Sequence, residues 1–109
     1  MNDDDNFEKL YHIVDGLNRR FSDGNDPFQI ITRLCEEAGE LAKEVNHFEG
    51  TGVKMQKHGA PDRAKLAKEV QDVMRAALSV ARHYSIENEL AFSIDGSYEK
   101  LLREGFISR

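Results

Sequence analysis

Apolar residues recur at steps of three and four along most of this chain, and this period is the strongest constraint on its fold. Such spacing places side chains on one face of an α-helix, whereas a half-buried strand needs strict alternation. The pattern predicts four helices, over residues 7–21, 27–48, 63–84 and 86–102, with the last one interrupted at Asp95-Gly96. Strand signals are nearly absent. We therefore expect an all-α protein in which a four-helix bundle buries the apolar faces.

Three helix starts are marked by side chains that can accept hydrogen bonds from the first free N–H groups, at Asp26-Pro27, Asp62 and Ser85. Residues 50–61 contain three glycines and a proline, so they are expected to form a loop. Each of the two middle helices carries one apolar stripe that should face the core. These stripes are Ile30, Leu34, Ala38, Leu41, Val45 and Phe48, and Leu66, Val70, Val73, Ala77, Val80 and Tyr84.

Composition excludes several classes of protein. The length of 109 residues indicates one domain, small enough that oligomerisation would help its stability. A net charge of −5 argues against a general nucleic-acid binder, and no apolar run approaches the roughly 20 residues of a membrane span. The acidic residues 1–6 lack a signal-peptide core, and Cys35 is the only cysteine, so no internal disulfide can form. We expect a cytoplasmic protein without nucleic-acid or membrane partners.

Two pairs of carboxylates stand out, Glu37 with Glu40 and Glu69 with Asp72. A separation of three residues places two side chains about 60° apart on a helix, so each pair can converge on one ligand. We measured angles around each helix axis from one stripe residue, Leu34 on the second helix and Leu66 on the third. The first carboxylate of each pair lies at about −60° from that residue and the second at about −120°. They occupy equivalent edges of two amphipathic helices, and they meet at the rim of the core if the stripes pack antiparallel.

Four carboxylates meeting without a counter-charge would repel one another strongly. A bound hard cation removes this repulsion, and oxygen-only ligands suit Mg²⁺, Mn²⁺ or Ca²⁺ rather than zinc. Acidic pairs at this spacing are also common on solvated helix faces, and this ordinary explanation stays open on spacing alone. The matched position of the two pairs makes a site for one of these hard cations as well supported as a solvated face.

The sequence Glu36-Glu37-x-x-Glu40, separated by 28 residues from Glu69-x-x-Asp72, resembles the signature of MazG-type nucleoside triphosphate pyrophosphohydrolases. The likeness extends over residues 33–47 and 66–73, and in total it covers about residues 28–84. The resemblance implies an all-α bundle that forms homodimers or homotetramers. It also implies Mg²⁺-dependent cleavage of non-canonical or surplus nucleoside triphosphates to a nucleoside monophosphate and pyrophosphate.

By motif position, the resemblance makes Glu37, Glu40, Glu69 and Asp72 the metal ligands. Glu36, Glu37 and Glu40 form the catalytic set, in which Glu36 would orient the attacking water. Carboxylate-bound Mg²⁺ would neutralise charge and position water, so hydrolysis needs no nucleophilic side chain.

The chain departs from this family near its end, where many relatives carry Lys-aromatic-x-x-Arg to hold phosphates. Here the segment reads Ser97-Tyr98-Glu99-Lys100-Leu101-Leu102-Arg103. The expected phosphate contacts are therefore Lys100 and Arg103 in a shifted register, together with Lys54 and Lys57 on the loop. The missing cations keep a second hypothesis open, a non-catalytic helical module that senses nucleotide or metal or mediates oligomerisation. Glu44-x-x-His47 resembles half of a di-iron site, but the sequence holds no second copy.

Overall fold

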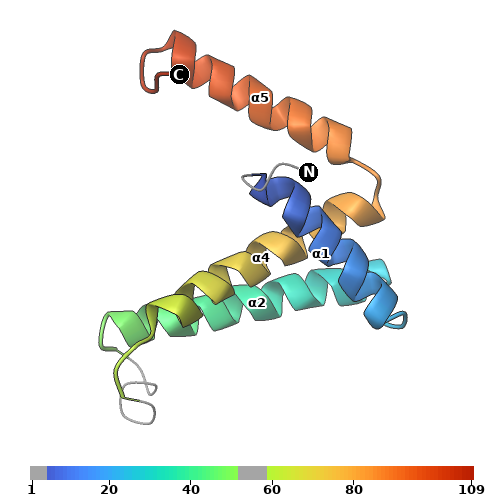
Figure 1. Ribbon diagram of the computed structural model, residues 1–109, viewed down its shortest axis with the longest axis vertical. Helices are drawn as coiled ribbons and strands as arrows, with labels where there is room; N and C mark the ends of the chain where they lie inside the picture. Colours follow the sequence, from blue (N-terminus) through green and yellow to red (C-terminus); the bar gives the residue numbers. More distant parts are fainter. Residues whose placement is uncertain (1–4, 52–58) are drawn as a thin grey trace.

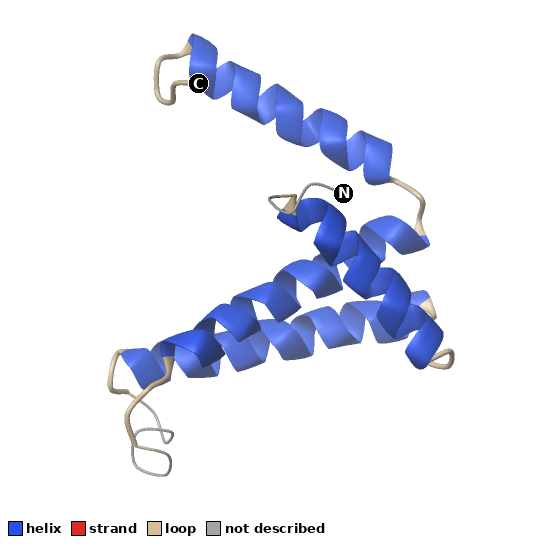
Figure 2. Cartoon of the chain, viewed as in Figure 1, coloured by secondary structure: helices blue, strands red, loops and turns tan. Residues whose placement is uncertain are grey.

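The computed structural model describes residues 5–51 and 59–109, and these residues form helices without any strand. The predictions of an all-α fold and of four helical segments are confirmed within this part of the chain (Figure 1, Figure 2). The helices are α1 (Asn6–Arg20), α2 (Pro27–Phe48), α4 (Arg63–His83) and α5 (Glu87–Arg103). In the described part of the chain, every helix falls short of the length or the hydropathy that a bilayer-spanning segment needs.

Two of the predicted helix starts are confirmed by capping hydrogen bonds. The Asp26 carboxylate accepts from the backbone N–H groups of Phe28 at 2.9 Å and Gln29 at 3.0 Å, ahead of α2. The Asp62 carboxylate accepts from the Ala64 N–H at 2.9 Å, ahead of α4. These bonds satisfy donors that have no partner inside the helix, so they fix where each helix begins.

The predicted start of α5 at Ser85 is wrong. Ser85 has a positive φ of 55° and ends α4 instead. Its N–H donates to the Arg82 carbonyl at 3.2 Å, and the Ile86 N–H donates to the Ala81 carbonyl at 3.0 Å. This pair of bonds is a Schellman motif, which requires a left-handed residue at this position rather than an extended cap. The interruption expected at Asp95-Gly96 is also wrong, because α5 runs through it without a break.

The helices α2 and α4 lie side by side and run antiparallel, and α1 crosses α4 (Figure 1). The hydrophobic core lies where α1 meets α4. Leu10, Val14 and Leu78 are buried there, and Tyr11 and Leu90 pack against them. This arrangement makes α4 the central helix, since it contacts each of the other three.

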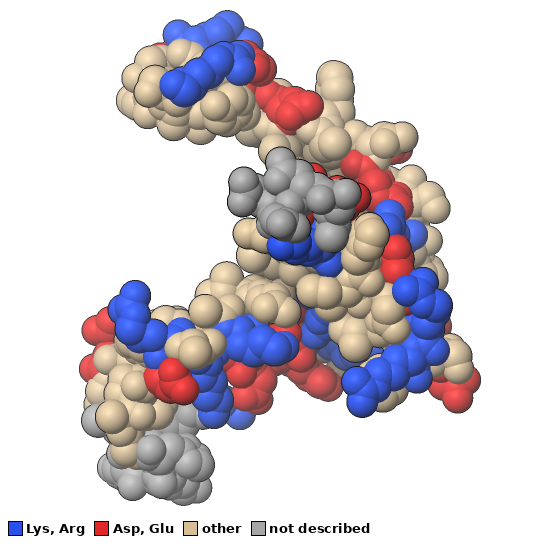
Figure 3. Space-filling view, in the orientation of Figure 1, with Lys and Arg blue, Asp and Glu red and all other residues tan. Residues whose placement is uncertain are grey.

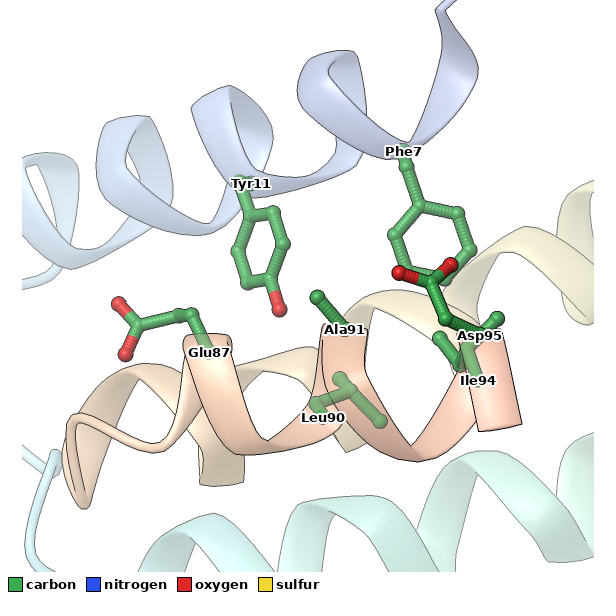
Figure 4. Close-up of a pocket in the computed structure, with 7 residues that line it drawn as sticks. All are labelled: Phe7, Tyr11, Glu87, Leu90, Ala91, Ile94 and Asp95. Carbon is green, nitrogen blue, oxygen red and sulfur yellow. The ribbon is translucent and has the colours of Figure 1, made fainter. Parts of the chain in front are cut away.

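The last helix, α5, diverges from the other three, so one chain does not close into a bundle (Figure 1). Its first turns meet α1, where Phe7 and Tyr11 face Leu90, Ala91 and Ile94 (Figure 4). No residue of α5 is buried. The apolar side chains of α5 therefore remain largely exposed in a single chain.

The predicted apolar stripes describe only part of the buried surface. On α2 the buried residues are Ile30, Glu44 and His47, whereas Val45 is 45% exposed. Ala38 on α2 and Val70, Ala77 and Tyr84 on α4 are exposed as well. Because α2 presents a more polar side to α4 than the stripe predicts, carboxylates lie between these two helices.

Candidate metal centre

Three of the four predicted metal ligands converge between α2 and α4. Carboxylate oxygens of Glu37, Glu69 and Asp72 all lie within 4.8 Å of one another. Glu37 comes from α2, and the other two come from one turn of α4 at the i, i+3 spacing that aligns them on one face. We refer to these three residues as the carboxylate cluster. In the described residues, no other group of three His, Cys, Asp or Glu side chains comes this close together.

The surroundings of the cluster disfavour the ionised form of Glu37. Partial burial raises the pKa of the Glu37 carboxyl above its ordinary value, and the neighbouring carboxylates of Asp72 and Glu69 raise it further. The guanidinium of Arg75 and the ammonium of Lys68 oppose this shift in pKa. The net direction is upward, so a negative charge on Glu37 is less favourable here than in water.

Two cations already contact the cluster. The Lys68 ammonium donates a hydrogen bond of 2.6 Å to Asp72, and the Arg75 guanidinium lies 3.8 Å from a Glu37 oxygen. Figure 3 shows acidic and basic side chains interleaved over this part of the molecule rather than gathered into one acidic surface. Lys68 is mostly exposed, so it can leave Asp72 at little cost when a divalent ion competes for the carboxylate.

The fourth predicted ligand, Glu40, lies outside the cluster in this structure. Its carboxylate is 3.5 Å from the Lys43 ammonium, three residues further along α2. Glu36, predicted to orient water, has an exposed side chain. The backbone of α2 keeps Glu40 one turn beyond Glu37, on the same edge of the helix.

Two of the four predicted phosphate contacts, Lys100 and Arg103, form no ion pair with the cluster in this structure. Lys100 lies 4.0 Å from Glu104, just after α5, and Arg103 is exposed. The helix that carries them contacts α4 and not α2. Lys54 and Lys57, the other two predicted contacts, lie outside the described residues.

Glu44 and His47, which the sequence pairs by their spacing, are buried close to the loop end of α2, and their burial was not predicted. The side chain of Glu44 is fully buried, 3.6 Å from the Lys65 ammonium and 3.8 Å from Nδ1 of His47. Nε2 of His47 lies 2.5 Å from the Gly59 carbonyl, so this nitrogen carries the proton and donates. The Glu44-x-x-His47 spacing identified the pair, but only packing shows that the pair faces α4 and the end of the loop.

Sequence reasoning also missed the two cations beside the cluster. Lys68 precedes Asp72 by four residues, and Arg75 follows it by three, which are the spacings of neighbours on one helix face. These spacings could have identified both residues. Which of them also reaches Glu37 on the neighbouring helix depends on how α2 and α4 pack.

The chain is similar in sequence to a bacterial protein. The chain is 29% identical over 92 residues to a protein of Bacillus subtilis (strain 168) described as the uncharacterized protein YpjD. The matched region spans 84% of this chain and 75% of the relative. No family model matches the chain. No solved structure matches it either.

Proposed function

We propose that this protein is a Mg²⁺-dependent nucleoside triphosphate pyrophosphohydrolase of the MazG-like type. The observation that carries the proposal is the convergence of Glu37, Glu69 and Asp72 from two antiparallel helices. These residues are three of the four that the family signature assigns to the metal. The proposed products are a nucleoside monophosphate and pyrophosphate.

The donor set fits a hard divalent cation. All three side chains offer carboxylate oxygen and no nitrogen or sulfur, which suits Mg²⁺ or Mn²⁺. When bound, the metal would act as a Lewis acid toward phosphate oxygens and would lower the pKa of a coordinated water. The three carboxylates would hold and orient it, and they would leave the solvent side open for the triphosphate.

Two further glutamates on α2 have roles in this proposal. Glu40 lies one turn from Glu37, so a change of rotamer that releases Lys43 would bring its carboxylate toward the metal. The exposed carboxylate of Glu36 would accept a hydrogen bond from the attacking water and hold that water in line with the scissile bond.

The test of the proposed activity is release of pyrophosphate from a panel of canonical and modified nucleoside triphosphates in the presence of Mg²⁺. Asp72→Asn and Glu69→Gln should each reduce turnover by about a hundredfold or more, because each removes a charged ligand from the metal. Glu89→Gln is the matched control, since Glu89 is an exposed glutamate on α5. Absence of turnover with every triphosphate, while Mg²⁺ binding is demonstrated, would refute the proposed activity.

We also propose that the protein is a homo-oligomer, a dimer or a tetramer. Large apolar side chains stay exposed on α5, including Phe92 at 81% exposure, and Phe106 just after the helix is 75% exposed. Figure 3 shows uncharged side chains over much of the visible face of α5, with basic and acidic side chains beside them. Large exposed apolar side chains on one helix are typical of a subunit interface.

One observation favours a second candidate, a non-catalytic module that senses nucleotide or metal. Within one chain, Lys100 and Arg103 lie on a helix that does not contact α2. Calorimetry with a nucleoside triphosphate and Mg²⁺ distinguishes the two functions. Tight binding without any pyrophosphate release would support the sensor, whereas turnover would exclude it.

A further inference from the structure

Arg75 is partly buried, and its guanidinium makes no hydrogen bond to the described residues. Its side chain is 17% exposed, and its only ion pair among the described residues is the 3.8 Å contact with Glu37. At that distance the guanidinium donates no hydrogen bond to Glu37, and it donates none to any other described side chain or carbonyl. A guanidinium has five N–H donors, and among the described residues no Arg75 nitrogen is a buried atom without a partner, so these donors stay accessible to solvent or to a ligand. Arg75 is therefore suited to bind a further anion.

A small cavity with both polar and apolar lining opens beside Arg75, where α1, α2 and α4 meet. Its volume is about 190 Å³, and its lining includes two arginines, Arg33 and Arg75, and no Asp or Glu. The other lining residues are Val14, Leu17, Asn18, Phe21 and Ser79. The Asn18 amide adds N–H donors to the two arginines, whereas the Ser79 hydroxyl already donates to the Arg75 carbonyl, so the arginines and Asn18 make the cavity suited to an oxyanion.

Arg33 is held in position by the turn between α1 and α2. Its guanidinium donates to the Gly24 carbonyl and, at 3.2 Å, to the side-chain oxygen of Asn25. This anchoring fixes a positive charge at one wall of the cavity. Arg75 forms another wall and also contacts the carboxylate cluster, so it lies between the cavity and the metal ligands.

We propose that Arg75 binds a phosphate group of the substrate, with the charge of Arg33 on the far side of the same cavity. This inference rests on the proposed function, and it assigns the phosphate-binding role to α4 rather than to Lys100 and Arg103 on α5. The cavity is smaller than the roughly 300 Å³ at which pockets for whole drug-sized ligands begin, so it fits one end of a nucleotide. An oxyanion shared between Arg75 and a metal on Glu37 would span the two neighbouring sites.

Metal and phosphate should bind cooperatively through Arg75. Without metal, Glu37 attracts the guanidinium; with metal bound, the carboxylate charge of Glu37 is largely taken up by the metal ion. The guanidinium then loses its counter-charge, and a phosphate oxyanion can replace it with shorter, bidentate hydrogen bonds. By thermodynamic linkage, phosphate should tighten metal binding by the same factor.

The test uses calorimetry of the full chain with Mg²⁺ alone and with pyrophosphate in saturating Mg²⁺. Arg75→Gln should weaken pyrophosphate binding by about tenfold or more, because charge-assisted hydrogen bonds are lost. Binding of Mg²⁺ alone should stay as tight or become tighter, since a positive charge is removed from beside the cluster. A merely structural ion pair with Glu37 would not produce these opposite responses. Arg75→Lys keeps the charge but lacks the planar guanidinium, so its affinity for pyrophosphate should lie between those of wild type and Arg75→Gln.

Two further variants complete the design. Arg19→Gln removes an exposed arginine at the end of α1 and should leave pyrophosphate affinity unchanged. Unchanged affinity in both Arg75 variants would overturn the inference, as would a loss that occurs in Arg103→Gln instead. Failure of the proposed function is a separate outcome. In that case wild type would bind pyrophosphate through Arg75 but would hydrolyse no triphosphate.

Discussion

At the scale of single residues, Glu37 links the carboxylate cluster to Arg75. It is the only member of the carboxylate cluster supplied by α2, and it contacts Arg75 as well. Its raised pKa means that the folded protein binds a proton at this carboxyl more tightly than the unfolded chain does. Ionised Glu37 therefore lowers the stability of the metal-free fold, and the same charge is what a divalent cation requires.

The pH dependence of stability tests this reasoning. As pH rises from the ordinary glutamate pKa through the raised value, the metal-free wild type should lose stability relative to Glu37→Gln, because the folded state must give up the extra proton. In EDTA at neutral pH, Glu37→Gln should unfold at the same or a higher temperature than wild type. Thermal melts at several pH values measure this difference, and a lower midpoint for the variant at neutral pH would contradict it.

Addition of Mg²⁺ should make wild type melt at a higher temperature than Glu37→Gln, the reverse of the order expected in EDTA. Wild type should gain several degrees in melting temperature with saturating Mg²⁺, because the ligand binds only the folded state. Glu37→Gln should gain little, since one charged ligand is missing. Equal gains in both proteins would show that Glu37 does not bind the metal. Na⁺ at matched ionic strength is the control for screening of surface charge.

At the scale of elements, the junction between α4 and α5 determines where the last helix points. Arg82 on α4 donates to both carboxylate oxygens of Asp15 on α1, at 2.9 and 2.8 Å, and to Glu87 on α5 at 2.9 Å. Its guanidinium also lies 4.5 Å from the centre of the Tyr11 ring. These bonds hold the pKa values of Asp15 and Glu87 below their ordinary range. One side chain thus joins three helices.

Loss of the hydrogen bonds from Arg82 to Asp15 and Glu87 should make α5 more mobile before the other helices unfold. Arg82→Gln keeps much of the length but removes the charge and the bidentate geometry, so α5 should exchange amide hydrogens faster while α2 and α4 are less affected. Because Asp15 has a lowered pKa, the slower amide exchange of α5 in wild type, relative to Arg82→Gln, should disappear as the pH falls through that lowered pKa and Asp15 becomes protonated. Hydrogen exchange with mass spectrometry measures both effects, and uniform acceleration over all helices would contradict them.

The left-handed residue at the same junction gives a prediction of opposite sign. Ser85 adopts a φ of 55°, which glycine tolerates better than a residue with a side chain. Ser85→Gly should raise the free energy of unfolding by about 0.5–1 kcal/mol, whereas Ser85→Val should lower it. Denaturant titration with unchanged slope measures the difference. If Ser85→Gly were the less stable variant, Ser85 would not be the end of a Schellman motif.

At the scale of the whole molecule, a single chain is more open than a compact domain of its length. Its radius of gyration is 16.8 Å, against about 13 Å for a compact domain of this length. Its accessible surface is 8027 Å², against about 6,100 Å² for a compact monomer of this mass. The excess is comparable with the area that one subunit of an obligate homodimer buries.

Oligomerisation should therefore make stability depend on concentration. Analytical ultracentrifugation should give a dimer or tetramer mass, and the melting temperature should rise with protein concentration. Phe92→Glu on α5 should shift the protein toward monomer, because it places a charge in the proposed apolar interface. Phe28→Glu, at another aromatic residue with 81% exposure, controls for the loss of a surface phenylalanine. A monomeric wild type at all concentrations would refute the proposed assembly.

The sequence by itself determined the helices and the positions of the carboxylates along them. Periodicity and capping act over a few residues, so the starts at Asp26 and Asp62 could be identified without a structure. The i, i+3 spacing likewise placed Glu69 and Asp72 on one face of α4.

Only the tertiary structure decided which side chains meet between helices. It groups Glu37 with Glu69 and Asp72 but not Glu40, buries Glu44 beside an exposed Val45, and brings Arg75 to the cluster. The physical reason is that helical spacing fixes a side chain only relative to its own helix axis. The rotation of α2 against α4, which no local interaction fixes, decides the contacts across the interface.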